Sequence, residues 1–397
     1  MANVSSSNGL EKRPKLRFPD FDEPWAVFRA EELFQNITDK NHPNETVLTI
    51  IQGKGTLPRE QAGRNIHYDD ASLSNYKKVE QGDYIIHLRS FEGGLEMANE
   101  DGIVSPAYTI LRCKKPHSSL FYEAYFHTDE FINHILSKSV EGIRDGRQIS
   151  YEAFKWLGLP YCNVSEQEKI AQLFYTLNRR IEKQQQMVDA LKKYKRGLLN
   201  KIFSNKDEKA YPTVYLSEVA DFLQGLTYSP SDVGKSGYLV LRSSNIQNGM
   251  LSFDDCVYVD KTIPESLQVK CADVIMCVRN GSKSLVGKTA LISNDMPLTT
   301  WGAFMMIVRS QLNDTYIFHY LNSQMFFSQV FKDTGTATIN QITKGILNEC
   351  KLPIPPVEER RKISKMLSSF DTKIQNAERI LSSLMEIRKA LLQQLFI

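Results

Sequence analysis

One segment of the chain has the glycine, lysine and hydroxyl residues of a phosphate-binding loop. It runs from Gly281 to Thr289. A phosphate loop has four residues between its glycines and is followed by a helix. Here five residues separate the two glycines, and residues 290–297 (ALISNDMP) have the pattern of a strand and a turn. We therefore predict a β-hairpin with a tight turn at Asn280-Gly281, not a nucleotide site.

Other catalytic chemistries lack their residues. The seven histidines show no H-x-x-x-H spacing and the six cysteines no C-x-x-C pair, which argues against a zinc site and a disulfide framework. A DNA adenine methyltransferase would need an Asn/Asp-Pro-Pro-aromatic loop, whereas Pro355-Pro356 is flanked by Ile354 and Val357. We expect no catalytic residue and no metal ligand in this chain.

Two parts of the chain carry loops whose composition is typical of DNA-binding proteins. Arginine and lysine contact phosphates, while arginine, asparagine and glutamine read base edges. The candidate residues of the first part are Lys54, Arg59, Arg64, Arg89, Arg144 and Arg147. Those of the second part are Arg242, Asn245, Arg279, Asn280, Lys283, Lys288, Asn340 and Gln341. Residues 83–89 (DYIIHLR) resemble residues 273–279 (DVIMCVR), so we place Arg89 and Arg279 at equivalent positions, and likewise Arg147 and Asn340.

These loops must be positioned by two copies of one helical pattern. Residues 159–203 match residues 352–396 without a gap at an offset of 193, which aligns Ile170 with Ile363 and Phe203 with Phe396. Apolar residues recur at heptad spacing, which predicts two long helices and a coiled-coil seam. The seam residues of the first copy are Ile170, Phe174, Leu177, Ile181, Val188, Leu191, Leu198 and Ile202. Those of the second copy are Ile363, Leu367, Phe370, Ile374, Leu381, Leu384, Leu391 and Leu395. Ser165 with Glu168 predicts a capping box at the start of the first helix.

The order of the predicted elements is globule, helix, globule, helix. Short strand-like runs such as residues 108–111 (YTIL) and 238–241 (YLVL) make both globules β-rich. A helix of about 38 residues spans roughly 57 Å. If the second helix pairs with the first, it most simply runs antiparallel. The expected object is pseudo-twofold, and its globules can contact DNA sites separated by about one turn, roughly 34 Å.

Three segments resemble the specificity subunits of type I restriction-modification systems. They are KLRFP followed by FDEPW (residues 15–25), SEQEKIAQLFYTLNRRIEKQ (residues 165–184), and LPIPPVEERRKISKMLSSFDTKI (residues 352–374). The resemblance implies two target-recognition domains that read a bipartite double-stranded DNA sequence. It also implies that the helices dock two methyltransferase subunits and that restriction subunits join them. S-adenosylmethionine, ATP and magnesium would then bind the partners, and the assembled complex would be an adenine-N6 methyltransferase and an ATP-dependent endonuclease.

We therefore predict an α+β fold with two β-rich target-recognition domains separated by two long helices that form an antiparallel intramolecular coiled coil. The expected divisions are a disordered tail (1–10), the first recognition domain (11–160), a central spacer helix (161–205), the second recognition domain (206–352) and a C-terminal spacer helix (353–397). The net charge of +3 permits an anionic partner without indicating one. No apolar run is long enough for a membrane span, and the scattered cysteines fit the cytoplasm. The alternative is a coiled-coil adaptor that binds proteins and not DNA.

Overall fold

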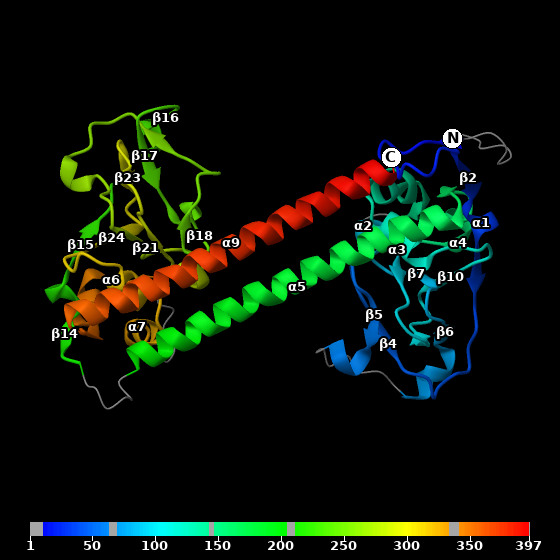
Figure 1. Cartoon of the computed structure of the whole chain (residues 1–397), viewed down its shortest axis with the longest axis horizontal. Helices are drawn as coiled ribbons and strands as arrows, with labels where there is room; N and C mark the ends of the chain where they lie inside the picture. The colour runs from blue at the N-terminus through cyan, green and yellow to red at the C-terminus, as the bar shows by residue number, and fades with distance from the viewer. Residues whose placement is uncertain (1–10, 63–69, 143–146, 205–210, 333–340, 397) are drawn as a thin grey trace. The chain divides into compact units, whose positions relative to one another are not determined.

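The computed structural model describes residues 11–62, 70–142, 147–204, 211–332 and 341–396. The chain divides into two compact units, of which unit 1 comprises Met1–Gln185 with Arg379–Ile397 and unit 2 comprises Gln186–Glu378. Two long helices, α5 (Val164–Phe203) and α9 (Val357–Phe396), each contribute one part to each unit. Figure 1 draws both as unbroken helices, α5 in green and α9 in orange to red. The predicted α+β fold with two long helices is confirmed. None of the helices in the described ranges is apolar over enough residues to cross a membrane.

Unit 1 is built on an antiparallel four-stranded sheet with the strand order β3-β10-β7-β8. A second sheet has the order β1-β2-β13, and three two-stranded ribbons pair β4 with β5, β6 with β9, and β11 with β12. The strands are β1 (Glu11–Lys12), β2 (Trp25–Arg29), β3 (Phe34–Ile37), β4 (Leu48–Ile51), β5 (Gly55–Pro58), β6 (Lys77–Val79), β7 (Tyr84–Ile86), β8 (Glu96–Met97), β9 (Gly102–Val104), β10 (Thr109–Cys113), β11 (Val140–Glu141), β12 (Gln148–Ile149) and β13 (Gly158–Tyr161). The short helices are α1 (Ala30–Leu33), α2 (Ser90–Gly93), α3 (Ser119–Phe126) and α4 (Tyr151–Phe154), with helical turns η1 (Arg59–Ala62), η2 (Asp70–Asn75), η3 (Glu130–Ile135) and η4 (Leu136–Ser139).

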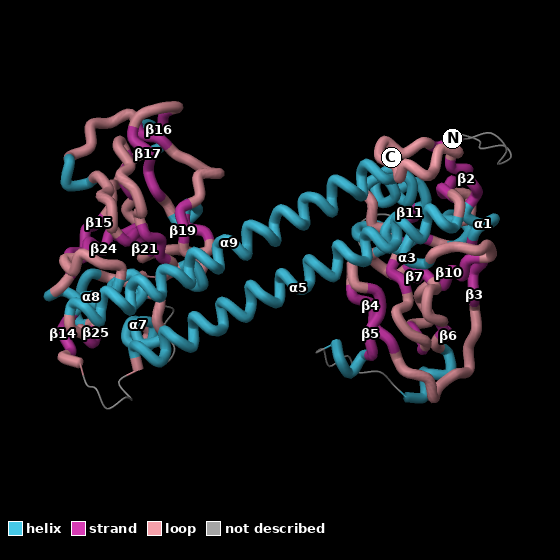
Figure 2. Tube along the Cα trace, viewed as in Figure 1, coloured by secondary structure: helices cyan, strands magenta, loops and turns pink. Residues whose placement is uncertain are grey.

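Unit 2 repeats this plan, because its sheet has the corresponding order β15-β24-β21-β22. Figure 2 labels β15, β24 and β21 of this sheet. A second sheet, β16-β20-β17-β23, has no four-stranded counterpart in the described part of unit 1, and two ribbons pair β14 with β25 and β18 with β19. The strands are β14 (Thr213–Tyr215), β15 (Ala220–Gln224), β16 (Val233–Gly234), β17 (Tyr238–Leu241), β18 (Ile246–Gln247), β19 (Met250–Leu251), β20 (Tyr258–Val259), β21 (Val274–Cys277), β22 (Thr289–Leu291), β23 (Thr299–Trp301), β24 (Met305–Ser310) and β25 (Lys351–Pro353). The helices are α6 (Tyr316–Leu321), α7 (Gln324–Val330) and α8 (Lys344–Glu349), with turns η6 (Leu216–Glu218), η7 (Pro230–Asp232), η8 (Ser243–Asn245), η9 (Glu265–Leu267) and η10 (Lys283–Leu285).

The long helices pack antiparallel within unit 1. Phe174 of α5 stacks on Phe396 of α9 at a centroid distance of 6.1 Å. Further along α5, Asn178 accepts a 2.7 Å hydrogen bond from Arg388 Nε. Residue numbers thus rise along α5 as they fall along α9. The end of α9 also enters the aromatic core, where Phe396 lies 6.1 Å from the ring of Trp25.

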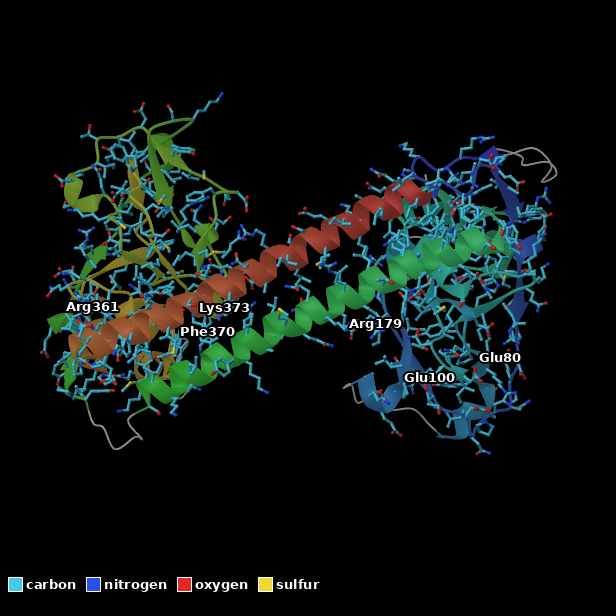
Figure 3. All side chains as sticks on the ribbon, viewed as in Figure 1. Glu80, Glu100, Arg179, Arg361, Phe370 and Lys373 are labelled. Carbon is cyan, nitrogen blue, oxygen red and sulfur yellow. The ribbon has the colours of Figure 1, made fainter. Side chains whose placement is uncertain are left out.

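Unit 2 shows the same antiparallel pairing. Lys192 bonds to Glu378 at 2.6 Å, and Lys195 forms an ion pair with Asp371. Phe370, labelled in Figure 3, packs 5.2 Å from the ring of Tyr194. Every seam residue predicted from the heptad pattern is buried or half-buried, so the predicted seam is confirmed in both units.

Two local predictions are wrong. The start of α5 is capped by Asn163, whose Oδ1 accepts from the Ser165 amide, while Glu168 is exposed. The predicted tight turn at Asn280-Gly281 is a long connection that contains η10, although β21 and β22 do pair as antiparallel neighbours. Residues 1–10 lie outside the described residues, as do Arg64, Arg144 and Asn340. The five-part division of the chain stays a prediction.

Candidate nucleic-acid interface

Lys54 is presented by a clamped turn between β4 and β5. Gly53 and Gly55 have φ values of +74° and +76°, which side chains with a Cβ rarely adopt. Their amides donate to the two carboxylate oxygens of Glu96, at 2.6 and 2.8 Å. Asn99 Nδ2 donates to the carbonyl of Lys54 at 2.8 Å. The backbone of the turn is therefore held from inside the unit, and the Lys54 side chain is exposed.

Arg59 does not lie in the same loop as Lys54. Strand β5 separates them, and Arg59 begins η1. The Arg59 guanidinium is half-buried, 5.9 Å from the ring of Tyr76. The loop predicted from its composition is thus a turn, a strand and a helical turn.

Two further predicted loops of unit 1 meet at α2. Arg89 immediately precedes this helix and is exposed. Phe91, within the helix, lies under the guanidinium of Arg147 at 4.2 Å. The structure therefore brings Arg147, just before β12, beside the helix that follows Arg89.

Unit 2 joins two predicted loops at Arg279. The backbone of Arg279 forms an isolated antiparallel bridge with Gln341, and both residues are exposed. The guanidinium of Arg279 lies 5.3 Å from the ring of Phe304, which is itself 59% exposed. For Arg89 and Arg279 the structure records no ion pair with any described residue, so both cations face solvent.

The predicted loop at residues 242–245 is held inside the unit. Asn245 is fully buried, and its side-chain amide donates to the carbonyls of Ser252 and Asp255. Arg242 forms a 2.7 Å ion pair with Asp255. The structure therefore gives Asn245 a structural role, and it pairs the Arg242 guanidinium with a carboxylate of the same unit.

The remaining candidates differ in exposure. Asn280 is half-buried and donates to Ser243 at 3.1 Å, which ties the Arg279 loop to η8. Lys288 donates to the carbonyl of Ile246 at 3.2 Å, whereas Lys283 on η10 is exposed. The described candidates with exposed side chains are Lys54, Arg89, Arg147, Arg279, Lys283 and Gln341.

Sequence reasoning missed a pair of a half-buried arginine and a buried aspartate that occurs in both units. Arg112 donates two hydrogen bonds, 2.8 and 2.7 Å, to Asp83 before β7. Arg309 does the same, at 2.7 Å for each bond, to Asp273 before β21. In each case the hydrogen bond that the arginine donates to the aspartate raises the pKa of the arginine. The shared aspartate of the DYIIHLR and DVIMCVR segments was the available signal.

A second missed feature fixes the start of each long helix. Glu166 is fully buried and accepts from Arg17 at 2.7 and 2.8 Å and from Trp25 Nε1 at 3.0 Å. At the offset of 193, Glu359 accepts from Tyr211 at 2.5 Å. The start of α5 is therefore tied to the segment around β2, and the start of α9 to the segment just before β14.

The described residues contain no group of three or more His, Cys, Asp or Glu side chains able to hold a metal ion. The exposed cations suit a phosphate or base partner.

Comparison with known proteins finds similarity to the specificity subunits of type I restriction-modification systems. The family model described as a type I restriction modification DNA specificity domain matches residues 208–386. The chain is 29% identical over 189 residues to the EcoKI specificity subunit of Escherichia coli (strain K12), covering 45% of this chain and 40% of that protein. It is 28% identical over 196 residues to the StySPI specificity subunit of Salmonella potsdam, covering 46% and 42%. These matches thus span less than half of the length of either relative.

A longer match extends to the MjaVIII specificity subunit of Methanocaldococcus jannaschii, at 20% identity over 91% of this chain and 88% of that protein. Among solved structures, the fold resembles a type I restriction-modification S subunit from M. genitalium, with a TM-score of 0.61, 16% identity, and coverage of 97% and 99%. It also resembles a chain from a structure that addresses complex assembly and conformational transition of the type I R-M system, with a TM-score of 0.55, 15% identity, and coverage of 95% and 99%. At these identities the structural likeness concerns the fold.

Proposed function

We propose that this chain is a specificity subunit of a type I restriction-modification system and that it binds a bipartite DNA target, one half-site per unit. We also propose that α5 and α9 hold methyltransferase subunits, two in number, and that restriction subunits join this complex. In this proposal the chain is not catalytic. S-adenosylmethionine, ATP and magnesium bind the partner subunits.

One observation carries the DNA-binding proposal. Arg89 and Arg279 follow equivalent strands, β7 and β21, and both are exposed. Arginine presents its donors as a planar fork that fits guanine O6 and N7, or a phosphate. An arginine beside an exposed backbone loop in each unit supports two separate readings of DNA.

The test uses the full chain with its methyltransferase partner and the duplex found by sequencing methylated sites. We expect Arg279→Ala to weaken recognition of one half-site and Arg89→Ala of the other. The loss should be roughly 1–3 kcal/mol where the contact is to a base. Arg279→Lys is the matched control, because lysine keeps the charge and loses the bidentate fork. If Arg279→Ala loses recognition of the half-site and Arg279→Lys retains it in full, Arg279 contacts a phosphate. That result would contradict the reading of a base by Arg279.

Salt titration on random-sequence DNA separates this proposal from a protein-binding adaptor. Neutralising phosphates releases counterions, so a DNA-binding chain loses affinity steeply as salt rises. An adaptor would show weak binding with little salt dependence, and that result would favour the adaptor.

A further inference from the structure

The residue that ends α3 and the residue that ends α6 make the same connection in their respective units. His127 follows α3, and its Nδ1 lies 2.8 Å from the carbonyl of Glu123, four residues earlier. Asn322 follows α6, and its Nδ2 donates to the carbonyl of Phe318, also four residues earlier, at 2.8 Å. Each side chain then reaches the edge strand of the four-stranded sheet. His127 Nε2 lies 3.2 Å from Glu96 on β8, and Asn322 donates to Thr289 on β22 at 2.8 Å.

The two connections differ in charge. A backbone carbonyl can only accept a hydrogen bond, so Nδ1 of His127 must donate. Both oxygens of Glu96 already accept, from the amides of Gly53 and Gly55, which favours the ionised carboxylate. Nε2 of His127 must therefore donate as well, and the ring is an imidazolium. In unit 2 the corresponding link between Asn322 and Thr289 is neutral at every physiological pH.

Burial and charge act on this pair in opposite directions. The Glu96 side chain is 1% exposed and that of His127 is 13% exposed. Burial alone would lower the pKa of His127, but the hydrogen bond and charge of Glu96 raise it above 6.5. Burial alone would raise the pKa of Glu96, but the hydrogen bond and charge of His127 lower it below 4.5. The charged pair is therefore present between the lowered pKa of Glu96 and the raised pKa of His127. It is lost as pH rises through the pKa of His127.

Other charged groups face the pair from neighbouring elements. Glu123 of α3 adds negative charge near His127, and His87 after β7 is a further neighbour. A cavity of about 380 Å³ in unit 1 joins His127 and Glu123 to charged residues of the hairpin and the long helices, namely Lys54, Arg179, Glu182 and Arg388. Figure 3 labels Arg179 on α5. The negative charges of Glu96, Glu123 and Glu182 favour the imidazolium, while the positive charges of Lys54, Arg179 and Arg388 oppose it.

We propose that His127 is a positioning residue, whose imidazolium holds Glu96 and through it the Lys54 turn in the DNA-reading conformation. Recognition of DNA by unit 1 then weakens when His127 loses its proton, whereas recognition by unit 2, which has Asn322 instead, does not. This inference rests on the proposed DNA-binding function. The first half of it, the clamp on the turn, can be tested without DNA.

The first experiment measures hydrogen exchange at the amides of Gly53 and Gly55 in the full chain, as protection relative to intrinsic rates, at about pH 6 and about pH 8.5. We expect protection to fall at the higher pH. In His127→Gln, a neutral amide takes the place of Nε2, so protection should be lower and should not depend on pH. The amides beside Thr289 in unit 2 serve as the internal control. Unchanged protection at Gly53 and Gly55 across this range would overturn the clamp.

The second experiment measures affinity for the methylated target duplex over the same pH range, in the complex with the methyltransferase. We expect the native chain to lose roughly three- to ten-fold on raising the pH, the size of one hydrogen bond, and His127→Gln to give a flat profile. Asn322→Ala is the matched control and should leave the pH profile unchanged. If protection at Gly53 and Gly55 falls with rising pH while the affinity for DNA stays constant, the positioning role of His127 is overturned. Absence of DNA binding at every pH would overturn the proposed function and the DNA half of this inference, and the exchange result would still decide the clamp.

Discussion

At the scale of residues, exposure separates cations that can meet a ligand from those that hold the fold. Arg112 and Arg309 are each bound by an aspartate, and Arg242 is bound by Asp255. Arg89 and Arg279 have the same side chain and face solvent. Sequence reasoning selected Arg89 and Arg279, because two similar segments end in them. It also selected Arg242 and Asn245 for their residue types. Their internal partners Ser252 and Asp255 could not be predicted, because they lie in a later loop whose path no local pattern predicts.

His319 in unit 2 gives a residue-scale prediction about acid stability. It is fully buried, with Nε2 3.2 Å from the Ser368 hydroxyl. Burial, with the positive charge of Lys195, lowers its pKa from 6.5 to about 3. The unfolded chain therefore binds this proton at a higher pH than the folded chain does. The resulting stability is fully present above pH 6.5 and is lost as pH falls toward 3.

We expect the free energy of unfolding of unit 2 to fall by about 2 kcal/mol between pH 6.5 and about pH 5 on account of His319. His319→Gln should remove that part of the acid sensitivity. Denaturant titrations at a series of pH values measure it. His134→Gln is the control, since the His134 side chain is 71% exposed. If the free energy of unfolding falls with pH as steeply in His319→Gln as in the native chain, the acid sensitivity comes from other groups.

At the scale of elements, the heptad periodicity predicted the long helices and their apolar seam. It did not predict the residue that caps α5, because a single hydrogen bond determines that position. The heptad pattern located both long helices and their buried seam, because a helix must place its apolar stripe against a partner. The start of α5 was placed on Ser165, but Asn163 makes the cap. Both residue types favour a cap, and the choice follows from the fixed position of Glu166 beneath Arg17 and Trp25, which involves residues some 140–150 positions apart.

The seam gives the element-scale prediction. Leu384 lies in the part of α9 that belongs to unit 1 and is 9% exposed, while the adjacent Met385 is 57% exposed. Leu384→Asp puts an unpaired carboxylate into the apolar interface with α5, at a cost of about 3 kcal/mol or more. We expect lower stability in denaturant titrations and loss of methyltransferase docking. Met385→Asp should leave the stability within about 0.5 kcal/mol of the native value. Equal stability of the two variants would show that this position is not part of the seam.

At the scale of the whole molecule, the repeat is stronger in three dimensions than in the sequence. The offset of 193 is visible only near the two helices, yet the sheets β3-β10-β7-β8 and β15-β24-β21-β22 have the same strand order. Strand pairing joins residues far apart in the chain, and many different apolar sequences are compatible with one order of strands in a sheet. The sheet order therefore could not be predicted from the sequence. The extra sheet β16-β20-β17-β23 in unit 2 shows how widely the units differ around a common frame.

The last prediction concerns the distance between the two half-sites. Both long helices continue from one unit into the other, and Gln186 and Arg379 are equivalent positions at the offset of 193. One heptad inserted after each keeps the 3.5-residue seam, so the coiled coil should still form. Each helix lengthens by about 10.5 Å, at 1.5 Å per residue. With a rise of about 3.4 Å per base pair, the preferred gap between half-sites should grow by about three base pairs.

DNA twist complicates the outcome in a way that can be measured. Three base pairs rotate the second half-site by roughly 100°, given about 10–10.5 pairs per turn. Binding assays on duplexes with a graded series of gaps therefore have two results that agree with a ruler, a longer preferred gap or a loss of affinity at every gap. A three-residue insertion at the same places is the control, because it breaks the seam and should lower stability itself. Tight binding of the heptad variant at the original gap would mean that something other than α5 and α9 sets the spacing.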